Sequence, residues 1–293
     1  GRKYDGLGSN YSEYIKKALT DFNELSVKKI VILPLFLSKY NHILQDLKIN
    51  FPLYKSKVQI HWEETMSESY MTGQILLDSV KKISKNPNQE SLVILGRGAT
   101  DVKSENLMSK ELESLSGYIK KRIEFKNIQT GIYYSNNANE NLRVNKDKEV
   151  DEMVMHAAAK RGDTLVIPFF IGPKYSNMMS LTHFFDRRFQ DIDIILNPDE
   201  ILLHPNVLLW MKKTANRYIP LSSHKSIGVV IMPHGATKPY NDAIEKTIEP
   251  LISKYKIEMA YGMGDALSIQ NAVSKLENQG ITNIIFVRMY PRP

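Results

Sequence analysis

Short runs of consecutive apolar residues recur along the chain, and each comes after a segment with helical periodicity. Residues 30–33, 165–167 and 284–287 are apolar at every position, which is typical of strands covered by helices on both faces. Ahead of each run, apolar residues recur every three or four positions, and a short turn separates the two patterns. The order of helix, turn and buried strand therefore occurs three times, which predicts a repeated unit.

The first and last copies can be laid over each other without a gap. The matching pairs are Ile15 with Ile269, Ala18 with Ala272, Leu19 with Val273, Phe22 with Leu276, Val27 with Ile281, Ile30 with Ile284, Val31 with Ile285, Ile32 with Phe286 and Leu33 with Val287. In both copies the helical pattern leads into the apolar strand at the same distance. We therefore interpret them as the same part of two units.

A second shared element precedes the helix of the repeat. Residues 91–100 and 229–237 both read as a strand, a glycine-containing turn and a polar stretch that leads into a helix. Such alternation predicts an α/β fold of tandem units, each a parallel sheet of about four strands with helices on both faces. We expect Leu92–Leu95, Leu165–Ile167 and Val229–Met232 to be buried central strands.

The phase of the repeat divides the chain into three segments. Residues 91–222 hold a complete unit, residues 1–90 the C-terminal part of a first unit, and residues 223–293 the N-terminal part of a further one. We interpret the chain as a piece of a longer protein and expect the two part-units to have poorly protected strand edges. The Asn- and charge-rich residues 134–148 are expected to form a long surface loop.

Composition excludes several chemistries. The chain has 293 residues, of which 42% are hydrophobic and 24% charged, as in a globular protein with two or three cores. No apolar run approaches the roughly 20 residues of a membrane span, so we expect no membrane partner. Because the chain has no cysteine, disulfides, thiolate metal sites, iron–sulfur clusters and cysteine nucleophiles are excluded.

The formal net charge of +7 is compatible with a nucleic-acid partner. The lysines are scattered as short pairs, however, such as Lys16 with Lys17 and Lys81 with Lys82. This distribution favours solvated helix surfaces over one basic patch. We therefore expect no nucleic-acid partner.

Two histidines follow predicted strands. His42 lies eight residues beyond Pro34, and His234 directly follows the strand of residues 229–233. The C-terminal ends of parallel strands line the crevice in which open α/β sheets bind ligands. A neutral imidazole binds first-row metal ions and accepts a proton near neutral pH. The position of His42 therefore favours a metal ligand or a base, with Asp46 either orienting His42 or capping the following helix.

These motifs resemble the class II chelatases, which include the sirohydrochlorin cobalt and iron chelatases. The resemblance rests on Pro34–Ser38 with His42 and Asp46, and on His234-Gly235-Ala236, in a tandem arrangement that covers nearly the whole chain. It implies a cytoplasmic lyase of cobalamin or sirohaem biosynthesis that inserts Co²⁺ or Fe²⁺ into sirohydrochlorin or a related tetrapyrrole. The family resemblance also implies that His42 and His234 together are the metal ligands and the catalytic residues. The implied partners are the tetrapyrrole and the divalent ion, and since the ion is a substrate no further cofactor is expected.

Several positions depart from the family pattern. Arg97 stands where the first histidine of the middle segment is expected, and Ser176 stands where the second is expected. The carboxylate that the family places after its second strand is replaced by Met263 or its neighbours in the last segment and by Leu7 in the first. These departures favour an alternative, a non-catalytic metal- or tetrapyrrole-binding protein derived from the same fold.

Three further alternatives follow from the residues. Arg97 either binds carboxylates at the periphery of a tetrapyrrole or is a solvated charge on a turn. A periplasmic-type binding protein also has βα domains, but the threefold repeat disfavours it. Because sequential elements usually neighbour their own unit, we expect His42 and His234 to stay apart unless the two part-units complete one another. The oligomeric state is left open.

Overall fold

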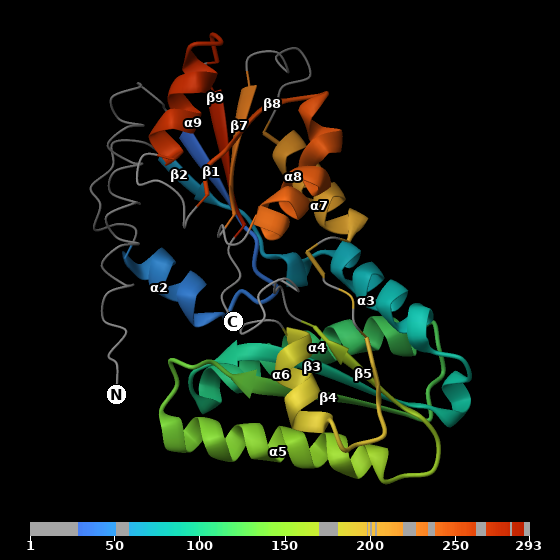
Figure 1. The fold of residues 1–293 in the computed structure, drawn as a ribbon. Helices are drawn as coiled ribbons and strands as arrows, with labels where there is room; N and C mark the ends of the chain where they lie inside the picture. Colours follow the sequence, from blue (N-terminus) through green and yellow to red (C-terminus); the bar gives the residue numbers. More distant parts are fainter. Residues whose placement is uncertain are drawn as a thin grey trace.

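The computed structural model describes residues 29–50, 59–169, 181–197, 199, 201–202, 204–218, 227–233, 238–261, 268–281 and 283–289. These residues form two parallel sheets with helices packed against them (Figure 1). We call them the terminal sheet, which contains strands from near both ends of the chain, and the middle sheet, which lies between them in sequence. The predicted α/β class is confirmed.

The middle sheet has four parallel strands in the order β4-β3-β5-β6. Its strands are β3 (Ser91–Ala99), β4 (Asn127–Tyr134), β5 (Thr164–Pro168) and β6 (Ile195–Leu196), and its helices are α4 (Val102–Lys120), α5 (Glu140–Ala158) and α6 (Leu181–Phe189). Alternate residues of β3 face opposite sides. Val93 and Leu95 pack with α5 and α6, whereas Leu92 and Ile94 pack with α4.

The terminal sheet has five parallel strands in the order β2-β1-β9-β7-β8. Its strands are β1 (Lys29–Pro34), β2 (Gln59–Trp62), β7 (Ile227–Pro233), β8 (Lys256–Met259) and β9 (Asn283–Met289). Helices α8 (Lys238–Ile252) and α9 (Ser268–Glu277) lie on its two faces. Close approach of α9 needs Gly228 on β7, because a Cβ there would lie 2.7 Å from Leu276.

The two part-units predicted from the sequence complete one another in this sheet. β1 pairs with β9, and Ile32 and Leu33 lie opposite Phe286 and Val287. These are the same pairs that the sequence superposition gives. The expectation of poorly protected strand edges is therefore not met at β1 and β9, which both lie inside the sheet. Each strand satisfies the open hydrogen-bonding edge of the other.

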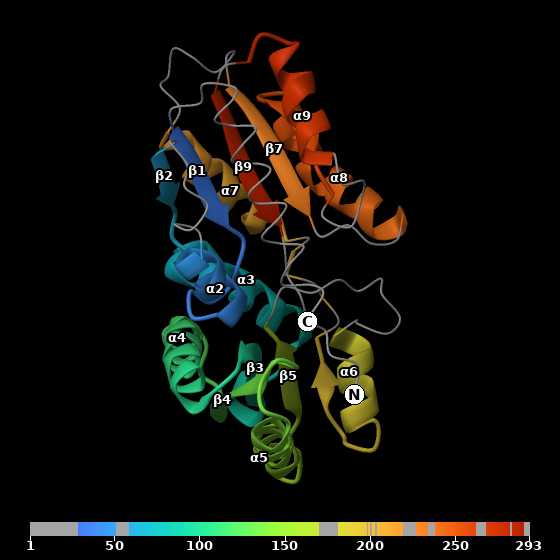
Figure 2. The same ribbon diagram turned by 90° about the vertical axis from the view of Figure 1, so that its left-hand side faces the viewer.

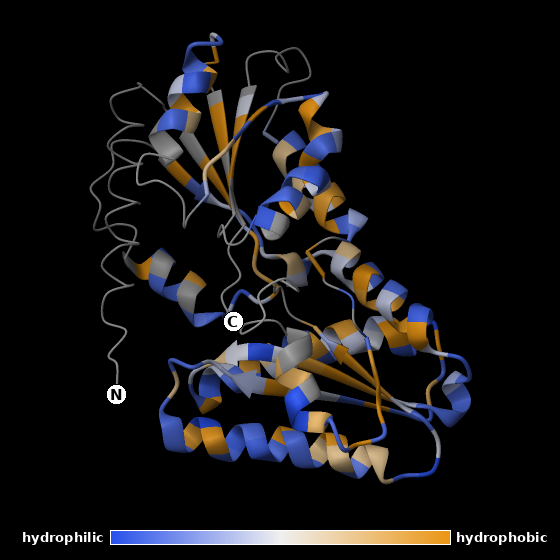
Figure 3. Cartoon of the chain, in the orientation of Figure 1, coloured by the Kyte–Doolittle hydropathy of each residue, from blue (hydrophilic) through white to orange (hydrophobic). Residues whose placement is uncertain are grey.

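The three predicted central strands lie inside their sheets. Leu92–Leu95 and Leu165–Ile167 are buried, and so are Val229–Ile231. Figure 3 shows the strands of both sheets largely in the colour of hydrophobic residues. For the residues described, this confirms the prediction from uniform apolar runs.

Residues 134–148 do not form a long surface loop, contrary to the expectation from composition. β4 extends to Tyr134, and α5 already begins at Glu140. The side chain of Asn139 caps α5 by accepting hydrogen bonds from the backbone nitrogens of Asn141 and Leu142. The first turns of α5 bury few apolar side chains, so the periodicity alone did not reveal them.

One apolar core connects the two sheets. Helix α3 (Tyr70–Ile83) packs on α4 of the middle sheet and on α7 (Pro205–Asn216), and α7 in turn contacts β1 and α8. The sheets are thus held by packed helices rather than by linkers alone. No described helix is long and apolar enough to cross a membrane.

The strand ends of the terminal sheet point toward the middle sheet. In Figure 2 the arrowheads of β1, β7 and β9 are directed at the lower half of the molecule. The loop after β1 there meets the end of β3 and the loop after β4. His42, at the end of that loop, contacts Gly98 and Asn137 of the middle sheet.

The β1–β9 register predicts that cysteines at positions 33 and 287 form a disulfide and that cysteines at positions 33 and 285 do not. Leu33 and Val287 are register partners, so their Cα atoms lie about 4.8 Å apart, within reach of a disulfide. Leu33 and Ile285 are offset by two residues, about 8 Å, which is too far. Because the chain has no cysteine, oxidation of Leu33→Cys/Val287→Cys should give an intramolecular bond, detectable by a gel shift. Equal cross-linking of Leu33→Cys/Ile285→Cys would contradict the register.

Candidate functional site

His42 is carried toward the middle sheet by a buried loop. β1 ends at Pro34, and the next two side chains, Leu35 and Phe36, are buried. Their burial anchors the loop to the core, so the backbone reaches α2 (His42–Asn50) along a defined path. His42 is the first residue of α2 and is partly exposed.

Both ring nitrogens of His42 have partners from the middle sheet. Nδ1 lies 3.3 Å from the carbonyl oxygen of Gly98, at the end of β3, and Nε2 lies 3.0 Å from the side-chain nitrogen of Asn137, after β4. A carbonyl oxygen only accepts and an amide nitrogen only donates. The network therefore assigns the proton to Nδ1 and leaves the lone pair of Nε2 as the basic position.

The environment keeps this imidazole neutral. Burial lowers the pKa of His42 from its ordinary value of 6.5, and the bond to Gly98 and the charge of Asp46 act in the opposite direction. The neutral ring is the form that binds metal ions and accepts protons. Asp46 lies inside α2 rather than ahead of it, so the interpretation of Asp46 as the helix cap is wrong.

Gly98 allows the end of β3 to approach the His42 loop closely. Its φ angle is +130°, a backbone conformation that residues other than glycine rarely adopt. A Cβ atom at this position would also lie 2.9 Å from Nδ2 of Asn41. Glycine is therefore needed here for the contact that holds Nδ1 of His42.

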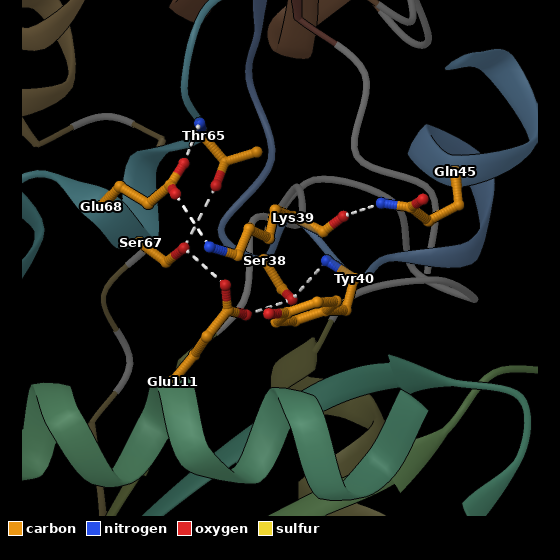
Figure 4. Close-up of polar contacts among 8 residues, drawn as sticks. All are labelled: Ser38, Lys39, Tyr40, Gln45, Thr65, Ser67, Glu68 and Glu111. Atoms are coloured by element: carbon orange, nitrogen blue, oxygen red, sulfur yellow. Dashed lines mark hydrogen bonds and ion pairs between the residues drawn. The ribbon is translucent and has the colours of Figure 1, made fainter. Parts of the chain in front are cut away.

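A second polar cluster ties the same loop to α4 (Figure 4). Glu111 of α4 accepts a hydrogen bond from Ser38 and another from Oγ of Ser67 at 3.0 Å. Beside it, Nζ of Lys39 lies 2.9 Å from Oε1 of Glu68. Burial raises the pKa of Glu111, although the two serine bonds partly oppose the shift. This cluster joins the loops after β1 and β2 to the middle segment next to His42.

A buried carboxylate after β2 has a structural role. Glu63 is only 6% exposed and accepts hydrogen bonds from Arg217, at 3.0 Å, and from the hydroxyl of Tyr218. His61 Nε2 lies 3.3 Å from the same carboxylate. These contacts fasten the end of β2 to the end of α7.

Several positions singled out in the sequence lie outside the described residues. These are His234, Leu7, Ser176 and Met263. The sheet brings the strand before His234 into the same layer as β1, but whether the two imidazoles share a site stays a prediction. Among the residues that the structure describes, no group of three or more His, Asp or Glu side chains is placed to hold a metal ion.

The sequence analysis missed the residues that hold His42. Asn137 lies in a stretch interpreted as a surface loop, and Glu111 is a carboxylate on a helix with no distinctive spacing. Their roles depend on the contact between two sheets, which periodicity within one element does not encode. The Asn-rich composition of residues 136–139 was the available signal, since amide side chains after a strand often contact ligands or backbone.

Comparison with known proteins gives matches in structure but none in sequence. No protein-family model matches the sequence, and no curated protein matches it. One similar solved structure is SirB from Bacillus subtilis with Fe³⁺, at 13% identity and a TM-score of 0.46, covering 71% of this chain and 87% of that one.

A second similar structure is DR2241 from Deinococcus radiodurans, at 12% identity and a TM-score of 0.42. It is described as a multi-domain protein with structural similarity to chelatases and with two additional novel domains. The match covers 70% of this chain and 51% of that one, so it extends over about half of that protein. Likeness at this level assigns neither a substrate nor a site residue to the present chain.

We expect His42 to titrate below its ordinary pKa of 6.5, and Asn137→Asp to raise that pKa. A carboxylate beside Nε2 favours the imidazolium form. Two-dimensional NMR titration of the imidazole protons, assigned with His42→Gln, measures both values. Asn139→Asp is the control, because it adds the same charge nearby at a residue that caps α5 instead of contacting the ring. A His42 pKa above 6.5 in the unmodified protein would refute this environment.

Glu111→Gln should remove one source of instability at neutral pH. Because the folded state raises the pKa of Glu111, ionisation costs stability as pH rises from the ordinary value of 4.5 through the folded value. The variant should therefore gain in free energy of unfolding, relative to the unmodified protein, over that interval and keep the gain at higher pH. Urea unfolding at several pH values measures it. Glu113→Gln, at an exposed position of α4, is the control and should show no such gain. The same dependence of the free energy of unfolding on pH in both variants would contradict the prediction.

Proposed function

We propose that this protein is a tetrapyrrole metal chelatase-like lyase that inserts Co²⁺ or Fe²⁺ into sirohydrochlorin or a related macrocycle. The observation that carries the proposal is the placement of His42, a neutral imidazole held between the strand ends of two parallel sheets. The sequence motifs around Pro34–His42 and His234 support the same reading. In this proposal residues 1–90, 91–222 and 223–293 are chelatase-like segments, and the protein works in the cytoplasm.

The chemistry of insertion requires a base beside the macrocycle. Two pyrrole N–H protons leave as one divalent ion enters, so the charge of the complex is balanced by two departing protons. Nε2 of His42 accepts one of these protons once the amide of Asn137 moves aside, and the proposal assigns the other proton to His234. Burial, which disfavours the imidazolium, then favours release of the proton and return to the neutral ring.

The proposal assigns the second imidazole to His234. β7 ends at Pro233, the residue before His234, and only β9 separates β7 from β1 in the sheet. Metal ions in transit need weak, incomplete coordination so that they can be passed on, and two imidazoles meet that need. The metal is a substrate here and not a resident cofactor.

The alternative is a non-catalytic metal- or tetrapyrrole-binding protein. Both ring nitrogens of His42 are already engaged by protein groups, and the described residues contain no cluster of three acidic or histidine ligands. These two observations favour binding without turnover. Activity measurements separate the two functions.

Replacing His42 should slow metal insertion by about 10²-fold, the usual contribution of a positioned general base. The assay follows the absorbance change of sirohydrochlorin with Co²⁺, Fe²⁺ or Ni²⁺, comparing the unmodified protein with His42→Ala and His234→Ala. His156→Ala is a matched control, because His156 is exposed on α5. Unchanged rates in both site variants would refute the assigned roles. Absence of acceleration with every metal would favour the binding-protein alternative.

A further inference from the structure

Three arginines gather at the C-terminal end of the middle sheet. Arg97 is at the end of β3, Arg143 is in the first turns of α5, and Arg188 is on α6. All three are partly buried. The acidic side chains that face them are Asp147 and Asp151 of α5. Three permanent positive charges therefore face two carboxylates in a partly desolvated place.

Two of these guanidinium groups share a neutral acceptor. Oδ1 of Asn136 accepts a hydrogen bond from Nη2 of Arg97 at 2.9 Å and another from Nη1 of Arg143 at 3.2 Å. Two like charges converge here on an amide oxygen, which carries no formal charge to offset their repulsion. A carboxylate oxygen in the same position would form stronger, charge-assisted bonds with both groups.

The guanidinium groups also retain unused donors. Among the residues that the structure describes, the Nε atoms of Arg97, Arg143 and Arg188 are buried and have no hydrogen-bond partner. Arg188 differs from the other two in its charge balance, because it lies 3.5 Å from Asp147 and 3.6 Å from Asp151. Buried donors without acceptors cost free energy, and for Arg97 and Arg143 no carboxylate at ion-pair distance offsets that cost among the described contacts.

The carboxylates leave this positive charge incompletely balanced. Burial raises the pKa values of Asp147 and Asp151, with the arginine charges partly opposing the shifts. Asp147 also accepts a hydrogen bond from the backbone nitrogen of Tyr134, and Asp151 accepts one from the hydroxyl of Tyr133. Their oxygens are thus partly occupied by donors other than the arginines.

An aromatic wall fixes the orientation of the cluster. The guanidinium carbon of Arg97 lies 5.1 Å from the ring centre of Phe184, and that of Arg188 lies 4.5 Å from it. Tyr133 and Phe185 pack against Phe184. Cation–π contacts hold planar guanidinium groups in place with little loss of donors. The rings therefore orient Arg97, one of the two arginines that share Asn136, together with Arg188.

The cluster is continuous with the His42 site. Arg97 precedes Gly98, whose carbonyl contacts Nδ1 of His42, and Asn136 precedes Asn137, which contacts Nε2. The same two loops therefore present the cations and hold the imidazole. One extended ligand can contact both.

We propose that Arg97 and Arg143 bind a carboxylate of the ligand, which displaces the amide of Asn136, while the ligand's centre faces His42. The ligand class is a planar macrocycle bearing several carboxylates. Its identity as a tetrapyrrole rests on the proposed function, whereas the carboxylate site does not. Arg97 stands at the position where the chelatase resemblance leads one to expect a histidine, so the proposed anion site takes the place of an expected metal ligand.

The test measures binding without metal, in buffer passed over a chelating resin. Tryptophan fluorescence or calorimetry follows the binding of two probes, sirohydrochlorin and the small tricarboxylate tricarballylate. Arg97→Gln should weaken both by about tenfold or more, the loss expected for one charge-assisted bond. Arg122→Gln is the matched control, because Arg122 is exposed and stacks on Tyr118 away from the cluster. Its affinities should stay within about twofold of those of the unmodified protein.

A second variant keeps the arginines in place. Asn136→Asp puts a carboxylate of nearly the same shape between Arg97 and Arg143, so it should occupy the site from within. We expect it to weaken both probes as Arg97→Gln does, with a thermal midpoint equal to or above that of the unmodified protein. A merely structural arginine cluster predicts the change in midpoint but no change in affinity.

Unchanged affinity for both probes in Arg97→Gln and Asn136→Asp would overturn the carboxylate site, whatever the insertion activity. Arginine-dependent binding of tricarballylate in a protein that inserts no metal would support the site and count against the chelatase proposal alone. The two proposals therefore fail separately.

Discussion

The pairing of β1 with β9 is the constraint on which the rest of the structure depends. A parallel strand buried by helices needs a hydrogen-bonded neighbour along each edge. β1 obtains one neighbour from β2 and the other from β9, more than two hundred residues along the chain. This pairing sets the direction of β1, hence the path of the loop that follows it and the position of His42.

The site forms where two sheets contribute what neither has alone. The terminal sheet supplies the imidazole, and the middle sheet supplies the carbonyl and amide that orient it. Glu111 fixes the same loop at a second point, because it accepts hydrogen bonds from Ser38 in that loop and from Ser67 after β2. The contacts of His42 with the strand ends of the middle sheet also explain its partial burial and its lowered pKa.

Local patterns were enough to predict the parallel α/β class and the central strands, because uniform apolar runs such as Leu92–Leu95 report burial on two faces directly. Ile32 and Phe286, which occupy equivalent positions of the repeat, are also register partners in the sheet. Local patterns did not show that equivalent strands would pair with each other. That outcome depends on which open edges are present, and the contacts that Asn137 and Glu111 make with the loop after β1 depend on it in turn.

The long separation between β1 and β9 also has a consequence for how the chain acquires its fold. The middle sheet needs no residue beyond Leu196, so during synthesis it can close while the remainder is still being made. β1 emerges first yet has to wait for residues 283–289 before its second edge is covered. Pairing over such a distance carries a large loop-closure cost and is slow. Until then the apolar residues of β1 are exposed to other newly made chains, and chaperones that shield such segments would improve the yield of folded protein.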